Sequence, residues 1–277
     1  MKHYLLRYGE ISLKGKNRPF FERKLVHNLK SYLKSQGIEG TVQRLRNRLF
    51  AETEKKVNWK PVFGLISYSP CTKIPGDYEA IQKKVEELSK GFTEKTSFRI
   101  TAQVLDNNSP YSQQQLNEQL GALVVKKTGA NVSLKKYEKE IGIEILQGNA
   151  YIYTKSHPCF GGLPVGVEGS VLLLIENEKS LLAGLMAMRR GCALFPIAKT
   201  PQDITLLERY SHGTRPQFKL LSEINLAEHI PRFELQALIV GDTLANFKKY
   251  PEIPLPILRP LIGYTEEKIQ EELRRYR

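Results

Sequence analysis

The chain has 277 residues, with 42 Lys and Arg against 29 Asp and Glu, a formal net charge of +13, three cysteines and one tryptophan. This length allows two or three domains with buried cores, and 41% hydrophobic with 26% charged residues excludes a disordered chain. The longest apolar run, residues 171–175, is far shorter than the roughly 20 residues of a membrane span. We therefore expect no membrane contact.

Cysteine usage and the N-terminal segment indicate the compartment. Charge interrupts the first seven residues too early for a signal peptide. Cys71, Cys159 and Cys192 are widely spaced and form no CxxC pair, which is not the pattern of a disulfide framework. His157 and Cys159 lack the second ligand pair that a four-coordinate zinc site needs, so we expect no metal. A cytoplasmic protein fits these features best.

The positive charge is concentrated at the start of the chain. Residues 1–60 hold 15 Lys and Arg against 5 Asp and Glu, whereas residues 166–277 hold 15 against 14. A basic excess on one small region is typical of a nucleic-acid contact surface, although a solvated basic surface explains the same count.

The first 75 residues alternate short strands and helices. The pattern predicts strands over 3–8, 41–52 and 67–72, helices over 19–35 and 59–63, and a loop over 9–17. Lys14, Lys16 and Arg18 lie on or beside that loop, where they can reach phosphates. Arg44, Arg46 and Arg48 are two residues apart, so a single strand over 41–52 would place them on one face. We expect these six residues to contact the phosphates of a nucleic acid.

Residues 76–165 predict a second α+β domain. Expected elements are helices over 77–90 and 113–127, strands over 98–105 and 132–134, and a hairpin within 141–154. Lys126 and Lys127 at the end of the second helix are further candidates for nucleic-acid contact, although a solvated helix end explains them equally well. A Gly/Pro-rich connector over 161–166 marks the boundary with the third part.

Residues 166–277 predict a parallel α/β sheet. The wholly apolar strand 171–175 leads directly into a helix over 179–190, another apolar strand follows at 237–240, and a helix over 265–275 begins at Thr265. Ligands of such sheets bind beyond the carboxyl ends of the strands, where glycine-rich loops admit phosphates. Residues 176–180 here contain no glycine and two carboxylates. An ordinary strand-to-helix turn explains them well.

Several motifs in chain order resemble the tRNA 4-thiouridine synthetases (tRNA sulfurtransferases). The opening matches in Tyr8-Gly9-Glu10 and in Lys14-Gly15-Lys16-Asn17-Arg18, and the connector Gly161-Gly162-Leu163-Pro164-Val165-Gly166-Val167 matches the link before the family's ATP-binding domain. Met188-Arg189-Arg190-Gly191 and Arg259-Pro260-Leu261-Ile262 match landmarks within that domain. The resemblance implies a ferredoxin-like domain (1–75), an RNA-binding THUMP domain (76–165) and a Rossmann-like PP-loop domain (166–277).

The resemblance also implies where ATP chemistry would lie. The family's pyrophosphate-binding motif Ser-Gly-Gly-Xaa-Asp-Ser falls on residues 175–180. Ser180 is the one residue of the motif that this chain keeps, and Lys179 stands where the motif has Asp. A second family motif, Gly-Glu-Ser-Leu-Gly-Gln, falls on 241–246 and keeps Gly241, with Asp242 in place of Glu. The stretch between them is shortened, and the chain ends before the expected sulfur-accepting cysteine. We therefore expect an eroded, truncated PP-loop domain with no catalytic residues and no cofactor.

Three hypotheses remain open at this stage. The first is a tRNA-binding protein of tRNA modification that has lost ATP chemistry. The partner that this first hypothesis would recruit is a separate sulfur-carrying or adenylating protein. The second is an active ATP-dependent sulfurtransferase with an atypical loop, using ATP and Mg²⁺ and taking its cysteine from another subunit. The third is a non-catalytic scaffold whose α/β domain serves homodimerisation, its basic charge being incidental.

Overall fold

The structure is a computed structural model that describes residues 1–106, 109–223 and 225–277. Packing groups the chain into two compact units. The first unit comprises residues 1–7, 38–57 and 67–158, and the second comprises residues 8–37, 58–66 and 159–277. No helix among the described residues is long and apolar enough to cross a membrane.

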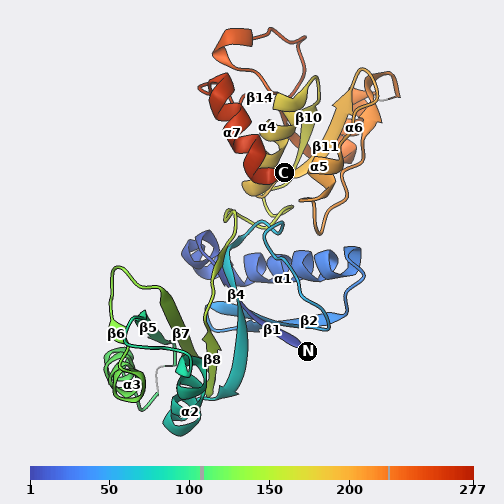
Figure 1. The fold of residues 1–277 in the computed structure, drawn as a ribbon. Helices are drawn as coiled ribbons and strands as arrows, with labels where there is room; N and C mark the ends of the chain where they lie inside the picture. Colours follow the sequence, from blue (N-terminus) through green and yellow to red (C-terminus); the bar gives the residue numbers. More distant parts are fainter. Residues whose placement is uncertain (107–108, 224) are drawn as a thin grey trace. The chain divides into compact units, whose positions relative to one another are not determined.

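A mixed sheet dominates the first unit (Figure 1). Its strand order is β2-β3-β1-β4-β8-β7-β5-β6, with β9 also pairing β4. The strands are β1 (Lys2–Tyr8), β2 (Gly40–Leu45), β3 (Arg48–Thr53), β4 (Leu65–Pro75), β5 (Ser97–Val104), β6 (Asn131–Val132), β7 (Lys139–Leu146), β8 (Asn149–Tyr153) and β9 (His157–Pro158).

The prediction of one strand over 41–52 is wrong. The segment is the antiparallel hairpin β2–β3, which turns at Arg46 and Asn47 and pairs Leu45 with Arg48. Asn47 has a φ of 60°, a conformation that asparagine tolerates better than most residues. Arg44, Arg46 and Arg48 therefore lie on one strand, in the turn and on the next strand. They do not share one strand face.

Two capped helices cover the THUMP-like part of this sheet. The side chain of Asp77 accepts a hydrogen bond from Ala80 N at the start of α2 (Tyr78–Ser89). Ser112 forms a capping box with Gln115 at the start of α3 (Gln113–Thr128), which ends at Gly129 with a φ of 71°. Apolar residues of both helices pack on β5 and β7. Both predicted helices are confirmed.

The second unit begins with two 3-10 turns, η1 (Glu10–Leu13) and η2 (Gly15–Asn17), in the predicted loop. They lead into α1 (Arg18–Ser35), a helix predicted from its apolar spacing. Turns replace the short helix expected over 59–63. Phe63 instead packs in an aromatic cluster with Phe160, Tyr210 and Tyr276.

The remainder of the second unit is a five-stranded, all-parallel sheet, as predicted. Its order is β12-β11-β10-β13-β14. The elements are β10 (Ser170–Leu174), α4 (Glu178–Arg189), β11 (Ala193–Ala198), α5 (Thr205–Glu208), β12 (Lys219–Leu220), η3 (Leu221–Glu223), α6 (Leu226–Arg232), β13 (Leu235–Ile239), η4 (Leu244–Asn246), β14 (Ile257–Leu258) and α7 (Glu266–Tyr276).

Alternating residues of β10 bury both faces of this sheet. Val171 and Leu173 join the core beneath α4 and α7, whereas Leu172 joins the core that packs against α6. The chain leaves β10 toward β11 on one side and returns to β13 on the other. This reversal is a topological switch point, and open α/β sheets bind ligands beyond the carboxyl ends of the strands at such a point. We use the word crevice for this position beyond β10 and β13.

Candidate functional site

The crevice contains the residues that follow β10 and β13. Glu176 and Asn177 lie between β10 and α4, and Gly241, Asp242 and Thr243 follow β13. These segments approach closely, because a Cβ added at Gly241 would lie 2.7 Å from the backbone nitrogen of Ser180. Glycine at 241 is therefore required by packing against the start of α4.

The chain's own side chains satisfy the start of α4. Asn177 Oδ1 accepts a hydrogen bond from Lys179 N at 2.9 Å. Ser180 Oγ accepts one from Glu176 N at 3.2 Å, and Ser180 is buried. This arrangement is a helix N-cap with a supporting turn.

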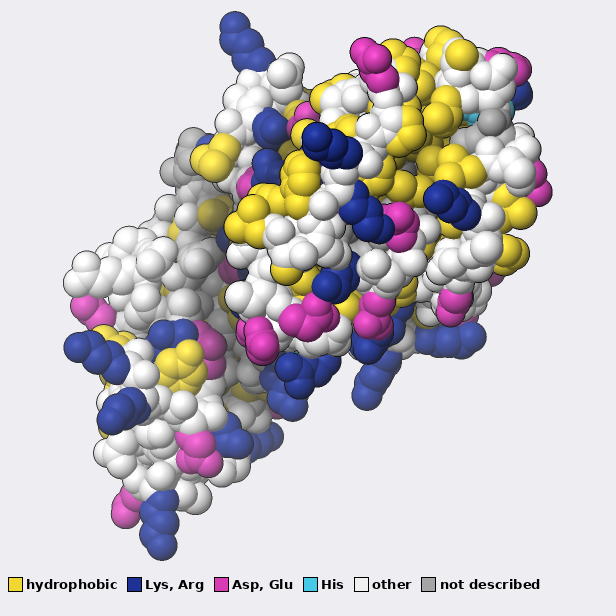
Figure 2. Space-filling model, turned by 90° about the horizontal axis from the view of Figure 1, so that it is seen from above, with side chains coloured by type: hydrophobic (Ala, Val, Ile, Leu, Met, Phe, Trp, Pro, Cys, Tyr) yellow, Lys and Arg dark blue, Asp and Glu magenta, His cyan; other side chains and the backbone are white. Residues whose placement is uncertain are grey.

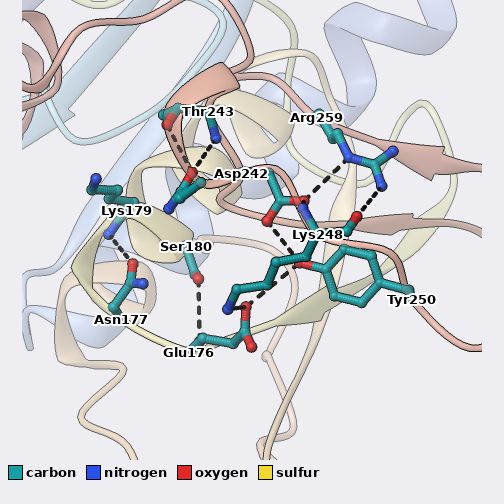
Figure 3. Close-up of polar contacts among 10 residues, drawn as sticks. Glu176, Asn177, Lys179, Ser180, Asp242, Thr243, Lys248, Tyr250 and Arg259 are labelled. Carbon is teal, nitrogen blue, oxygen red and sulfur yellow. Dashed lines mark hydrogen bonds and ion pairs between the residues drawn. The ribbon is translucent and has the colours of Figure 1, made fainter.

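Asp242 is the centre of a polar network in the crevice (Figure 3). Its side chain is 2% exposed, accepts a hydrogen bond from Tyr250 Oη at 2.7 Å and forms an ion pair with Arg259 Nε at 3.2 Å. Arg259 also donates to the carbonyl oxygen of Lys248. The carboxylate therefore fastens residues 247–259 to the end of β13.

Glu176 extends this network. Its Oε2 lies 2.9 Å from Lys248 Nζ and 3.5 Å from Tyr250 Oη (Figure 3). Burial, together with the hydrogen bond to Asp242, raises the pKa of Tyr250, so the phenol remains a neutral donor. Two carboxylates and the groups that neutralise them thus occupy the crevice.

A neighbouring hollow of about 390 Å³ lies beside the start of α4. Its lining includes the carboxylates Glu178 and Asp203, and Glu178 forms an ion pair with Arg277. Figure 2 shows basic and acidic side chains scattered among hydrophobic ones on the face that it presents. The near neutrality of residues 166–277 is visible as mixed charge.

The structure thus brings together Lys179, Ser180, Gly241 and Asp242, the four residues predicted for a nucleotide site. Lys179 Nζ forms an ion pair with Glu266 at 2.6 Å. Sequence reasoning missed Lys248, Tyr250 and Arg259. Arg259 contacts Asp242 across 17 residues of irregular chain, and such a contact leaves no periodic pattern in the sequence. The match of Arg259 to a family landmark was therefore the one sign of its role.

The basic residues near the start of the second unit differ in their surroundings. Lys14 Nζ lies 3.3 Å from Glu168 and above the Phe21 ring, whereas Lys16 is exposed. Arg18 donates to Tyr8 Oη at 2.6 Å and to Glu22 at 2.9 Å. Of these three, Lys16 is the most accessible.

The three predicted strand arginines also separate. Arg44 and Arg46 are exposed, and Arg46 lines a cleft of about 560 Å³ with Asp106. Arg48 Nε instead lies 2.6 Å from Oε2 of Glu144, a buried carboxylate that also binds Arg7 at 2.7 Å. Arg48 therefore stabilises the sheet through its ion pair with Glu144.

The helix-end candidates Lys126 and Lys127 are both exposed. Lys127 Nζ lies 3.7 Å from Glu86. Such a surface pair contributes little to stability, so both lysines can turn toward a ligand.

The three thiols are half-buried and poorly suited to sulfur chemistry. Burial raises the pKa of Cys71 and of Cys159 to about 12, and it also raises that of Cys192. Thiolate is the reactive form, and it is scarce at neutral pH under these conditions. Among the described residues, no three His, Cys, Asp or Glu side chains gather in a group that could hold a metal ion.

Comparison with known proteins identifies the family. The family model of the ThiI ferredoxin-like domain matches residues 3–69, and that of the THUMP domain matches residues 76–155. A probable tRNA sulfurtransferase of Moorella thermoacetica is 38% identical over 98% of this chain and 82% of its own length. The chain belongs to the tRNA sulfurtransferase family. A probable tRNA sulfurtransferase of Thermus thermophilus is 32% identical over 97% of this chain and 78% of its own length.

Solved structures agree on the fold of this tRNA sulfurtransferase relative. PH1313 of Pyrococcus horikoshii is 27% identical, covers 99% of both chains and has a TM-score of 0.87. A 4-thiouridine synthetase solved with RNA and ATP is 22% identical, with a TM-score of 0.76 over 100% of this chain and 85% of its own. The family member described here thus has ferredoxin-like and THUMP domains followed by a parallel α/β domain.

The Moorella relative has segments that this chain does not have. The alignment with the Moorella protein is 324 positions long, which exceeds the 277 residues of this chain. That relative therefore contains segments without a counterpart here.

Proposed function

We propose that this protein binds tRNA and acts in tRNA modification without ATP chemistry of its own. The proposal includes the division of the chain into three domains, with boundaries after residues 75 and 165. The observation that carries it is the polar network in the crevice beyond β10 and β13, where Glu176 and Asp242 bind Lys248, Tyr250 and Arg259.

The crevice fits a nucleotide poorly. A triphosphate needs backbone N–H groups at a glycine-containing loop, whereas Asn177 and Ser180 already use this turn as a helix cap. The carboxylate of Glu176 would repel phosphate oxygens. Lys248 and Arg259, which could neutralise phosphates, are bound to carboxylates. We therefore derive no step through ATP.

Binding to RNA is supported by the accessible cations. Lys16, Arg44 and Arg46 are exposed, as are Lys126 and Lys127. These groups suit phosphate contacts, which give affinity and salt dependence and little sequence reading. One structural neighbour, a 4-thiouridine synthetase, was solved in complex with RNA, and this chain shares that neighbour's fold.

The test measures tRNA and ATP separately. Fluorescence anisotropy with tRNA at several salt concentrations should show binding. Replacing Lys14 and Lys16 with Ala should lower the log–log salt slope by about one for each lysine that neutralises a phosphate. Calorimetry and thermal shift with ATP–Mg²⁺ should show no effect. AMP release from ATP would instead support a working sulfurtransferase, and absence of tRNA binding would favour a scaffold.

A further inference from the structure

A basic pocket in the first unit contains none of the residues proposed above to bind RNA. It has a volume of about 630 Å³ and is formed by the start of β1, residues 56–57, the middle of β4 and the segment before β9. Its lining residues are Met1, Lys2, His3, Tyr4, Lys56, Val57, Tyr68, Pro70, Cys71, Thr72, Lys155 and His157.

The sheet topology creates this pocket. β4 pairs with β9 at Ser67 and Tyr68, and with β8 only from Thr72 onward. Residues 69–71 lie between these two pairings, where the chain crosses from β8 to β9. Lys155 belongs to this crossing segment. The pocket therefore opens at an interruption of the strand ladder.

Its charge is strongly positive. Lys2, Lys56 and Lys155 are all exposed, and none forms an ion pair with a residue that the structure describes. No Asp or Glu occurs among the described lining residues. Next to the lining, Glu52 lies 3.3 Å from His3 Nε2. Three unneutralised ammonium groups around one hollow attract phosphate.

The pocket also contains an aromatic stack. The His157 ring lies 4.9 Å from the Tyr68 ring at an interplanar angle of 22°, and Tyr4 lies behind Tyr68 at 6.1 Å. Tyr4 and Tyr68 are buried, whereas His157 is half-buried. Tyr68 covers one face of the imidazole. The half-buried imidazole also lines the pocket, and bases stack on histidine and tyrosine rings in RNA recognition.

We propose that this pocket binds a nucleotide, with its base on His157 and its phosphate among Lys2, Lys56 and Lys155. The inference rests on the proposed RNA-binding function where the nucleotide belongs to RNA. Cys71 takes no covalent part, since burial raises the pKa of its thiol to about 12.

The first experiment reverses charge inside and outside the pocket. Lys56→Glu with Lys155→Glu should weaken tRNA binding about tenfold or more and lower the salt slope by about two. Lys55→Glu with Lys90→Glu makes the same charge change at exposed lysines that do not line the pocket. If both double variants lose affinity equally, the pocket proposal is overturned.

The second experiment tests stacking. His157→Phe retains a ring, whereas His157→Ala removes it, so the Ala variant alone should lose several-fold affinity. Equal tRNA affinity of the two variants contradicts a stacked RNA base, and equal affinity for AMP or UMP as well contradicts any stacked base. Circular dichroism of each variant checks that the sheet is intact.

A third measurement separates the sources of the nucleotide. AMP, UMP and inorganic phosphate are titrated while NMR follows the His157 ring protons. Saturable shifts with AMP or UMP, together with unchanged tRNA affinity in the Lys56/Lys155 variant, assign the pocket to free nucleotides. Loss of tRNA affinity assigns it to RNA. If the parent protein binds no tRNA, the proposed function fails, and the pocket proposal then stands or falls on the free-nucleotide titration.

Discussion

Two buried carboxylates, one in each unit, bind arginine in different settings. Glu144 lies inside the mixed sheet and binds Arg7 and Arg48 from two other strands. Asp242 lies beyond the end of a parallel strand and binds Arg259 and Tyr250 from an irregular segment. The first ion pair joins strands that belong to one backbone-paired sheet. The second lies beyond the sheet edge, so the same chemistry holds an irregular segment in one unit and joins the strands of a sheet in the other.

The strongest test of this comparison is Glu144→Gln. Breaking a buried pair leaves Arg7 and Arg48 without their counter-charge, and we expect a loss of about 3–5 kcal/mol in unfolding free energy. Hydrogen exchange of β5 and β7 peptides measures it. Glu140→Gln, a matched change on the same strand, removes a half-exposed pair with Arg99 and should lose under about 1 kcal/mol. Equal losses would mean that burial of Glu144 has no energetic consequence.

Asp242→Asn should have the next largest effect. The amide keeps a hydrogen-bonding oxygen and removes the charge, and Arg259 is 19% exposed and can recover hydration. We expect a loss of about 1.5–3 kcal/mol, the range for hydrogen bonds to charged groups. Trp59, the one tryptophan, is buried in the second unit, so its fluorescence during urea unfolding measures this loss. The exposed Glu252→Gln is the control, and an equal effect would contradict a stabilising network.

His212 is a buried group that forms no ion pair with any residue the structure describes, and its titration sharpens the comparison. The residue is 9% exposed and packs against the Tyr32 ring. Burial lowers the pKa of its imidazole from 6.5 to about 4. The unfolded chain takes up this proton below about pH 6.5, and the folded chain does so only near pH 4. Stability should therefore fall by about 2 kcal/mol between pH 7 and pH 5.

His212→Gln should remove most of this acid sensitivity, because the side chain no longer titrates. Urea unfolding followed by Trp59 fluorescence at both pH values provides the measurement. His27→Gln, at an exposed position, is the matched control. A variant that keeps the full pH dependence would assign it to other groups.

Local signals accounted for most of the fold. Asp77, Gly129 and Thr265 mark helix ends as predicted, and the apolar strand before α4 indicated the parallel sheet. The β2–β3 hairpin was not predicted because the alternation of side chains continues through its turn. Asn47, with its positive φ, was the single local sign of a turn. The shared location of Lys179, Ser180, Gly241 and Asp242 followed from the resemblance, which places two family motifs on residues 175–180 and 241–246. Their partners Tyr250 and Arg259 depend on tertiary packing, which leaves no spacing in the sequence.

The family model of the ferredoxin-like domain ends at residue 69, and that of the THUMP domain begins at residue 76. Strand β4 runs across the gap between them. Its residues Thr72–Pro75 pair with β8. A fragment that starts at residue 76 would therefore leave the outer side of β8 as an open edge strand, free to pair with another molecule. Such a fragment should aggregate, and one that retains residues 72–75 should be better behaved in solution.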